Sequence, residues 1–161
     1  MLDNVQKELN RFAKYVVSQS KANLTRGKKK SSNRLYDSID YDLNVSPNSF
    51  SLKFLMEEYG KFQDKGVSGT KKKYDTPYSY KDKMPPPNKM DKWIVKKNLK
   101  GLRNDKGQFI SRKSLQFMIA RSIFRKGIKP SLFFTRPFNK AFESLGDDIL
   151  DNLDLDFKNN K

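Results

Sequence analysis

Two stretches in the first half of the chain alternate apolar and polar residues with a period of two. They span residues 38–45 and 50–56, and the residues between them include Ser-Pro-Asn-Ser, a run that favours a turn. Alternation on both sides of a turn is typical of a β-hairpin with one buried face. The face expected to be buried consists of Ile39, Tyr41, Leu43, Val45, Phe50, Leu52, Phe54 and Met56.

Elsewhere the apolar residues recur every three or four positions, which predicts amphipathic helices. Three are expected, over residues 3–24, 112–126 and 137–150. Together with the hairpin they predict an α+β fold, in which amphipathic helices pack on a small antiparallel sheet.

Shorter elements are expected between these helices. Helical segments are predicted near residues 57–62 and 90–99, and Leu132-Phe133-Phe134 has the composition of a short strand. Ser111 or Ser114 is suited to cap the helix at 112–126.

Residues 64–92 have no usable periodicity and contain three consecutive prolines, Pro85 to Pro87, which favour an extended chain. A long segment of this kind inside a domain is typical of a functional arm or of disorder. We therefore expect a single domain, residues 1–161, with an extended Lys/Pro-rich insertion at 64–92. Residues 151–161 are acidic, and carboxylates oppose the dipole at a helix C-terminus, so a flexible tail is expected there.

The net charge is +16, with 35% apolar residues. Residues 143–161 carry a net charge of −4, so the first 142 residues carry +20. A basic body favours anionic partners, and an acidic end could complement the body of an identical subunit. A merely solvated lysine-rich surface is the alternative. The candidate assembly or anion contacts are Lys28, Lys29, Lys30, Lys71, Lys72, Lys73, Asp147, Asp148 and Asp151.

Catalytic chemistry has little support in the sequence. The chain has no histidine and no cysteine, which removes the commonest general base, the usual nucleophile pairs and thiolate metal sites. Asp40 and Asp42 would share one strand face, but such a pair is far more often the polar side of an amphipathic strand. Glu57 and Glu58 lack the strand context of metal-dependent nucleases. We expect no enzyme activity, no cofactor, no metal and no small-molecule substrate.

No apolar run approaches the length of a membrane span, and charged residues interrupt the N-terminal stretch where a signal peptide would be apolar. The sequence therefore predicts a protein made in a reducing cytoplasm, or used in a particle assembled there, without a membrane partner.

Three motifs, in order, resemble the neck and tail-completion proteins of tailed bacteriophages. The first is Arg34-Leu35-Tyr36-Asp37-Ser38-Ile39, preceded by Asn33 where that family has glycine. The second runs from Tyr59 to Gly69, as Tyr-Gly-Lys-Phe-Gln-Asp-Lys-Gly-Val-Ser-Gly, and the third opens a helix as Arg-Pro-Phe. The resemblance covers about residues 5–150, and the long Lys/Pro insertion departs from it. Its motif residues are Tyr59, Gly60, Phe62, Gly66, Gly69, Pro137 and Phe138.

The resemblance implies structural roles for these residues: glycines for close approach or positive φ, a proline to start a helix and a phenylalanine to anchor it. It implies a homo-oligomeric ring in the virion neck, assembled in the host cytoplasm, that joins the portal or its adaptor to the tail. DNA would pass through the ring, with only non-specific contact. The alternative is a non-catalytic nucleic-acid-binding protein that uses basic loops at 26–34 and 71–83.

Overall fold

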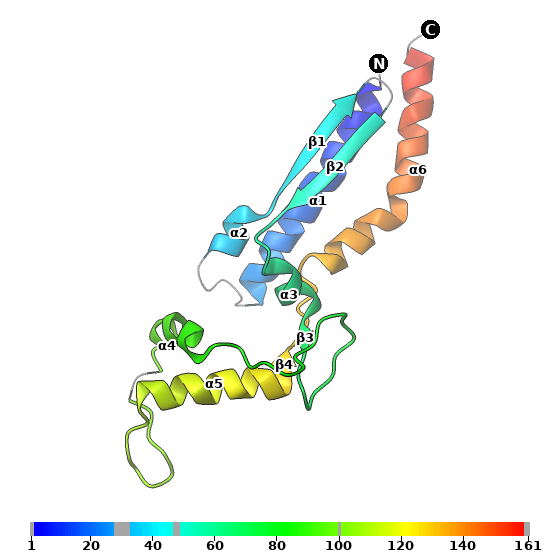
Figure 1. The fold of residues 1–161 in the computed structure, drawn as a ribbon. Helices are drawn as coiled ribbons and strands as arrows, with labels where there is room; N and C mark the ends of the chain where they lie inside the picture. The colour runs from blue at the N-terminus through cyan, green and yellow to red at the C-terminus, as the bar shows by residue number, and fades with distance from the viewer. Residues whose placement is uncertain (1, 28–32, 47–48, 100, 160–161) are drawn as a thin grey trace. The chain divides into compact units, whose positions relative to one another are not determined.

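The computed structural model describes residues 2–27, 33–46, 49–99 and 101–159 (Figure 1). The chain divides into two compact units. The first unit combines residues from both ends of the chain, up to Gly60 and from Leu132 onward, and the second unit is the intervening Lys61–Ser131. The sequence had predicted one domain. The second unit is contiguous in sequence, whereas the first is not.

The first unit is built on a long helix and a hairpin. Helix α1 (Asp3–Arg26) contacts both strands, β1 (Asp40–Ser46) and β2 (Ser49–Leu55), and it also contacts helix α6 (Thr135–Asn159). A short helix, α2 (Arg34–Ser38), precedes the hairpin. Figure 1 shows the hairpin lying along α1, with α6 beside it. The α+β fold with an antiparallel hairpin is thus confirmed.

The register of the hairpin follows from its alternation. Tyr41 pairs with Phe54, Leu43 with Leu52 and Val45 with Phe50, so these six residues share one face, whereas Leu55 lies on the opposite, exposed face. Most of the six-residue face packs against a core that α1 and α6 form from Val5, Leu9, Phe12, Val16 and Leu145. Val45 is an exception, because it is exposed near the turn. A second cluster in the same unit contains Leu24, Leu35, Ile39 and Phe133.

Two expectations for this unit need correction. Residues 132–134 are not a strand: Leu132 has φ of +51°, which breaks extended geometry, and Phe133 instead fills the second cluster. The last helix does not end near residue 150, because α6 continues to Asn159. The acidic segment expected to be a flexible tail is therefore helical as far as it is described.

Among its described residues, the second unit contains one helix of 15 residues, shorter helical segments and two strands of two residues each. Its elements are the end of α3 (Gly60–Lys65), β3 (Val67–Ser68), a 3-10 helix η1 (Pro87–Met90), α4 (Asp91–Lys96), α5 (Arg112–Lys126) and β4 (Gly127–Ile128). Strand β3 pairs antiparallel with β4. Helix α5 begins where predicted, with the Ser111 side chain accepting a hydrogen bond from the Ser114 backbone N–H.

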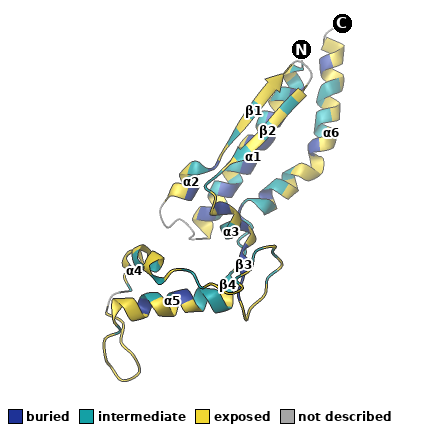
Figure 2. Ribbon diagram, in the orientation of Figure 1, coloured by how far each residue is buried: buried dark blue, intermediate teal, exposed yellow. Residues whose placement is uncertain are grey.

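Helix α5 was expected to pack on the hairpin, but it belongs to the second unit. It contacts η1 and α4, and its buried residues are Leu115 and Ala120. Much of its remaining surface is exposed in Figure 2. The reason is that the proline-rich segment before it supplies η1 and α4 as a local packing partner.

The insertion at 64–92 has little regular structure, as predicted, yet it is held by specific contacts. The backbone of Ser68 exchanges hydrogen bonds with Tyr78 and Tyr80, and its side chain bonds to the backbone of Tyr74. The Phe62 and Tyr78 rings meet edge to face, with centroids 4.7 Å apart. The segment is therefore a structural part of the second unit.

Candidate functional site

A row of exposed apolar residues runs along α6. Phe142, Leu150 and Phe157 are 57%, 65% and 62% exposed. Their spacings of eight and seven residues are each about two helical turns, so the three lie on one side of the helix. Gly146 lies between them, and nothing lies within 4 Å of where its Cβ would be. We call Phe142, Gly146, Leu150 and Phe157 the apolar row.

An acidic row lies next to the apolar row. Glu143, Asp147 and Asp151 each follow a residue of the apolar series by one position, and all three are exposed. Two of the three are acids that the sequence singled out. The third acid singled out, Asp148, is half-buried, with a carboxylate oxygen 3.9 Å from a terminal guanidinium nitrogen of Arg11. Helix α6 therefore exposes the apolar row to solvent, with the acidic row next to it.

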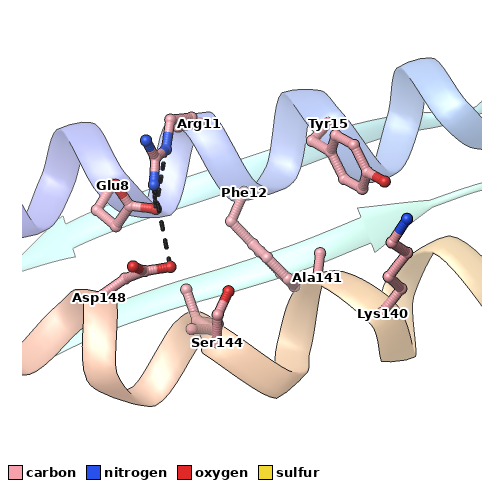
Figure 3. A pocket seen from close by; sticks show the side chains of 9 residues that line it. Glu8, Arg11, Phe12, Tyr15, Lys140, Ala141, Ser144 and Asp148 are labelled. Atoms are coloured by element: carbon pink, nitrogen blue, oxygen red, sulfur yellow. Dashed lines mark hydrogen bonds and ion pairs between the residues drawn. The ribbon is translucent and has the colours of Figure 1, made fainter.

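An open pocket of about 310 Å³ lies between α1 and α6 (Figure 3). At one end, the Arg11 guanidinium donates to the buried carboxylate of Glu8 at 2.9–3.1 Å and faces Asp148. Figure 3 shows Tyr15 and Lys140 at the other end. Because Arg11 pairs with Glu8 and faces Asp148, the arrangement is that of a solvated groove with an internal ion pair.

The carboxylate of Asp156 lies at the start of α1. It accepts hydrogen bonds from the backbone N–H groups of Asn4 and Val5 and from the side-chain amide of Asn4, at 2.8–3.1 Å. Burial raises the pKa of Asp156, but these hydrogen bonds together outweigh burial and hold the pKa below its ordinary value. The first turn of a helix has N–H groups without helical partners, so this carboxylate caps α1.

The tyrosine-glycine motif is divided between the two units. In the first unit, Tyr59 is exposed, while Gly60 is buried so closely that an added Cβ would lie 2.8 Å from Leu35 Cδ1. In the second unit, Gly66 has φ of +74°, and an added Cβ would lie 2.5 Å from the Ile128 carbonyl oxygen. An added Cβ on Gly69 would collide with the Arg125 backbone. These glycines therefore allow the backbone to pass close to its neighbours.

The third motif anchors α6 in the first unit. Pro137 is buried in the first turn of the helix. The Phe138 ring packs against Phe12, Phe54 and Phe134, with centroids 5.7–5.8 Å apart. This aromatic cluster joins α1, β2 and α6, so the Arg-Pro-Phe motif has a structural role.

The basic residues singled out at Lys71, Lys72 and Lys73 form an exposed turn in the second unit. The turn is fixed by its backbone: the N–H groups of Lys71 and Lys72 donate to the Arg125 carbonyl at 2.9 and 3.1 Å. Lys28, Lys29 and Lys30 lie outside the described residues.

Asp91 links α4 to α5. It forms a two-pronged ion pair with the Arg112 guanidinium at 2.5 and 2.7 Å and accepts a hydrogen bond from Gln116 at 2.6 Å. Hydrogen bonding from Arg112 is the main cause that lowers the pKa of Asp91, and the same pair raises the pKa of Arg112. The pair holds two helices of the second unit together.

Three of the four carboxylates weighed as catalytic candidates have local partners. Asp40 accepts from the Tyr41 N–H, Asp42 from the Asn44 side chain, and Glu57 pairs with Arg34 at 3.1 Å. Within the described part of the chain, no group of three or more acidic residues is placed to hold a metal ion. Over the same residues, no helix is both long and apolar enough to cross a membrane.

Sequence reasoning missed two of the features above. The Asp156 cap joins residues about 150 positions apart in the sequence, and no local pattern predicts such a pair. The only related signal is that the last helix is rich in carboxylates. The apolar row was not recognised, because periodicity cannot distinguish a buried edge from an exposed one and Phe157 lies beyond the predicted end of the helix.

No protein-family model matches this chain, and neither a curated protein nor a solved structure is significantly similar to it.

Proposed function

We propose that this chain is a structural subunit of the neck of a tailed bacteriophage. Copies form a ring that joins the portal or its adaptor to the tail and leaves a channel for DNA. The proposal rests on the three ordered motifs, and the observation that carries it furthest is the apolar row of α6. Three of the four large apolar residues exposed on α6 lie on this side of the helix, Leu155 being the fourth, and exposed apolar residues grouped in this way are typical of an interaction surface.

The occupant of the α6 surface in this proposal is a second copy of the chain. The acidic row beside the apolar row disfavours contact between two α6 helices, because like charges would meet. Net positive charge elsewhere in the chain favours contact with a cationic surface of the next copy. A contact between two different surfaces is heterologous, and repetition of it closes a ring when the rotation permits.

The particle mass in solution, measured by mass photometry and sedimentation, tests the proposal. The wild-type protein should form discrete oligomers without added DNA. The double variant Leu150→Ser, Phe157→Ser should remain monomeric with an unchanged melting temperature, because neither side chain belongs to the described core. A wild type that remains monomeric at high concentration, and does not incorporate into phage particles, would contradict the proposal.

A matched control removes an exposed aromatic residue from the second unit. Phe109 is as exposed as Leu150, and it lies in the loop before α5. Phe109→Ser should assemble like the wild type. If Phe109→Ser also abolished assembly, general surface hydrophobicity rather than the α6 surface would drive association.

A further inference from the structure

The charge of this chain is concentrated in one of its two units. Residues 61–131 contain 20 of the 34 cationic side chains and 5 of the 18 acidic ones, so the second unit has a net charge of +15. The first unit therefore has a net charge of +1, the remainder of the total of +16. General lysine enrichment would affect both units, so the segregation requires a specific explanation.

The acids of the second unit do little to offset this charge. Asp64 is buried and Asp91 is engaged by Arg112, which leaves Asp75, Asp82 and Asp105 as its exposed acids. Among the described residues, no ion pair is seen for the exposed cations Lys71, Lys73, Arg121 and Lys126.

Several of these cations are held together by the backbone. Thr70, Lys71 and Lys72 donate their N–H groups to the carbonyls of Phe124 and Arg125 at 2.9–3.1 Å. The lysine turn is thereby fixed at the C-terminal end of α5, beside Arg125 and Lys126. Arg121 lies one helical turn earlier, on the same side of α5 as Arg125. Segments about 50 residues apart thus form one cationic surface, and its mutual repulsion favours an anionic partner.

We infer that this surface, formed by the Lys71–Lys73 turn and the C-terminal half of α5, binds the phosphate backbone of duplex DNA. The amount of charge on this surface favours duplex DNA over a second copy of the chain as the partner. Among the described residues of α6, the acids without a described partner are Glu143, Asp147 and Asp151, so the α6 surface of a second copy could offset little of +15. Duplex DNA carries one negative charge per roughly 1.7 Å of its axis, so about 25 Å of duplex would suffice.

The residue types indicate contact with phosphate rather than base recognition. Sixteen of the 20 cations in the second unit are lysines. Lysine presents a flexible point charge, whereas specific base contacts most often use the two-pronged arginine fork. Binding should therefore be independent of sequence and strongly dependent on salt. The inference uses the second unit alone and does not depend on ring formation.

The test is the fluorescence anisotropy of a labelled duplex of about 30 base pairs and mixed sequence, titrated with the full chain at several salt concentrations. Each lost phosphate contact should reduce the slope of log K against log salt by about 0.9. The triple variant Lys71→Gln, Lys72→Gln, Lys73→Gln should bind at least about tenfold more weakly and reduce that slope by roughly 2 to 3.

The control removes the same charge from the first unit. Lys7, Lys14 and Lys53 are all exposed, so Lys7→Gln, Lys14→Gln, Lys53→Gln lowers the net charge by the same amount. The affinity of this variant for the duplex should stay within about threefold of the wild-type value, because the three replaced lysines lie outside the proposed DNA-binding surface. Circular dichroism melts check that both triple variants remain folded.

Three results would overturn the inference: wild type that does not bind the duplex at near-physiological salt, equal losses in the two triple variants, or a lysine-turn variant that changes particle mass but not DNA affinity. The last would assign the surface to a protein partner. Because DNA affinity and particle mass are measured separately, failure here is distinguishable from failure of the ring proposal.

Discussion

Asp156 and Asn4, at opposite ends of the described chain, are joined by hydrogen bonds: the carboxylate accepts from the Asn4 backbone N–H at 3.0 and 3.1 Å and from its side-chain amide at 2.8 Å. A buried carboxylate is favourable here because the N-terminus of α1 supplies donors and a positive dipole end. Acidic residues near the C-terminus of α6 interact unfavourably with the dipole of that helix. At Asp156, the hydrogen bonds from the first turn of α1 offset this effect.

Asp156→Asn should lower the melting temperature at neutral pH, because an amide is a weaker acceptor for these N–H groups. The folded-state pKa of Asp156 lies below the value of about 3.9 expected in the unfolded chain. Its contribution to stability is therefore present above that unfolded pKa and is lost as the pH falls through the folded pKa. Thermal melts from pH 6 to pH 2 should show the difference from the wild type shrinking with acidification.

The control for this effect is Asp151→Asn, on the exposed side of the same helix. It should change the melting temperature little at any pH. A wild-type advantage over Asp156→Asn that stays constant down to pH 2 would mean that the carboxylate charge does not stabilise α1.

Phe54→Ala should destabilise the first unit by about 2–4 kcal/mol, which extends below the roughly 3–5 kcal/mol typical of a phenylalanine removed from a core. Phe54 is only half-buried, but its ring contacts Phe12, Phe134 and Phe138 with centroids 5.3–6.1 Å apart. Urea unfolding measures the loss. The control is Val45→Ala, which is exposed on the same hairpin and should cost far less. Equal losses would show that the hairpin face does not support the aromatic cluster.

Gly66→Ala should destabilise the second unit more than Gly107→Ala. Both glycines have positive φ, +74° and +76°, and the strain of an L-residue there costs about 1–2 kcal/mol. Only at Gly66 would the new methyl group also meet the Ile128 carbonyl, since nothing lies within 4 Å at Gly107. Trp93 is the only tryptophan and lies in this unit, so its fluorescence in urea reports the difference.

Deletion of residues 70–88 should disrupt the second unit. The segment supplies Tyr78 and Tyr80, which bond to Ser68, and it leads into η1, which packs on α5. A freely attached arm could be removed without loss, so an unchanged Trp93 fluorescence melt would restore the arm hypothesis. Circular dichroism of the same variant shows whether helical structure elsewhere is retained.

The sequence predicts the elements that depend on local signals better than those that depend on contacts between residues far apart in the chain. The hairpin and α5 were predicted nearly to the residue, because period-two alternation and a capping serine are local signals. The second unit was not predicted, because its core depends on a turn chemistry without periodicity: a buried Ser68 bonding to Tyr74, and a positive φ at Gly66. Charge segregation could have been counted from the sequence only once the unit boundaries were known.

The division of the chain has a consequence for the order in which the protein folds during synthesis. The first unit needs α6, so α1 and the hairpin leave the ribosome long before the helix that completes their core. The second unit is contiguous and can close as soon as Ser131 has emerged. During that interval, the apolar face formed by the hairpin and α1 remains partly exposed to solvent. Slow steps in refolding should therefore depend on α6 reaching the N-terminal elements, a closure across most of the chain.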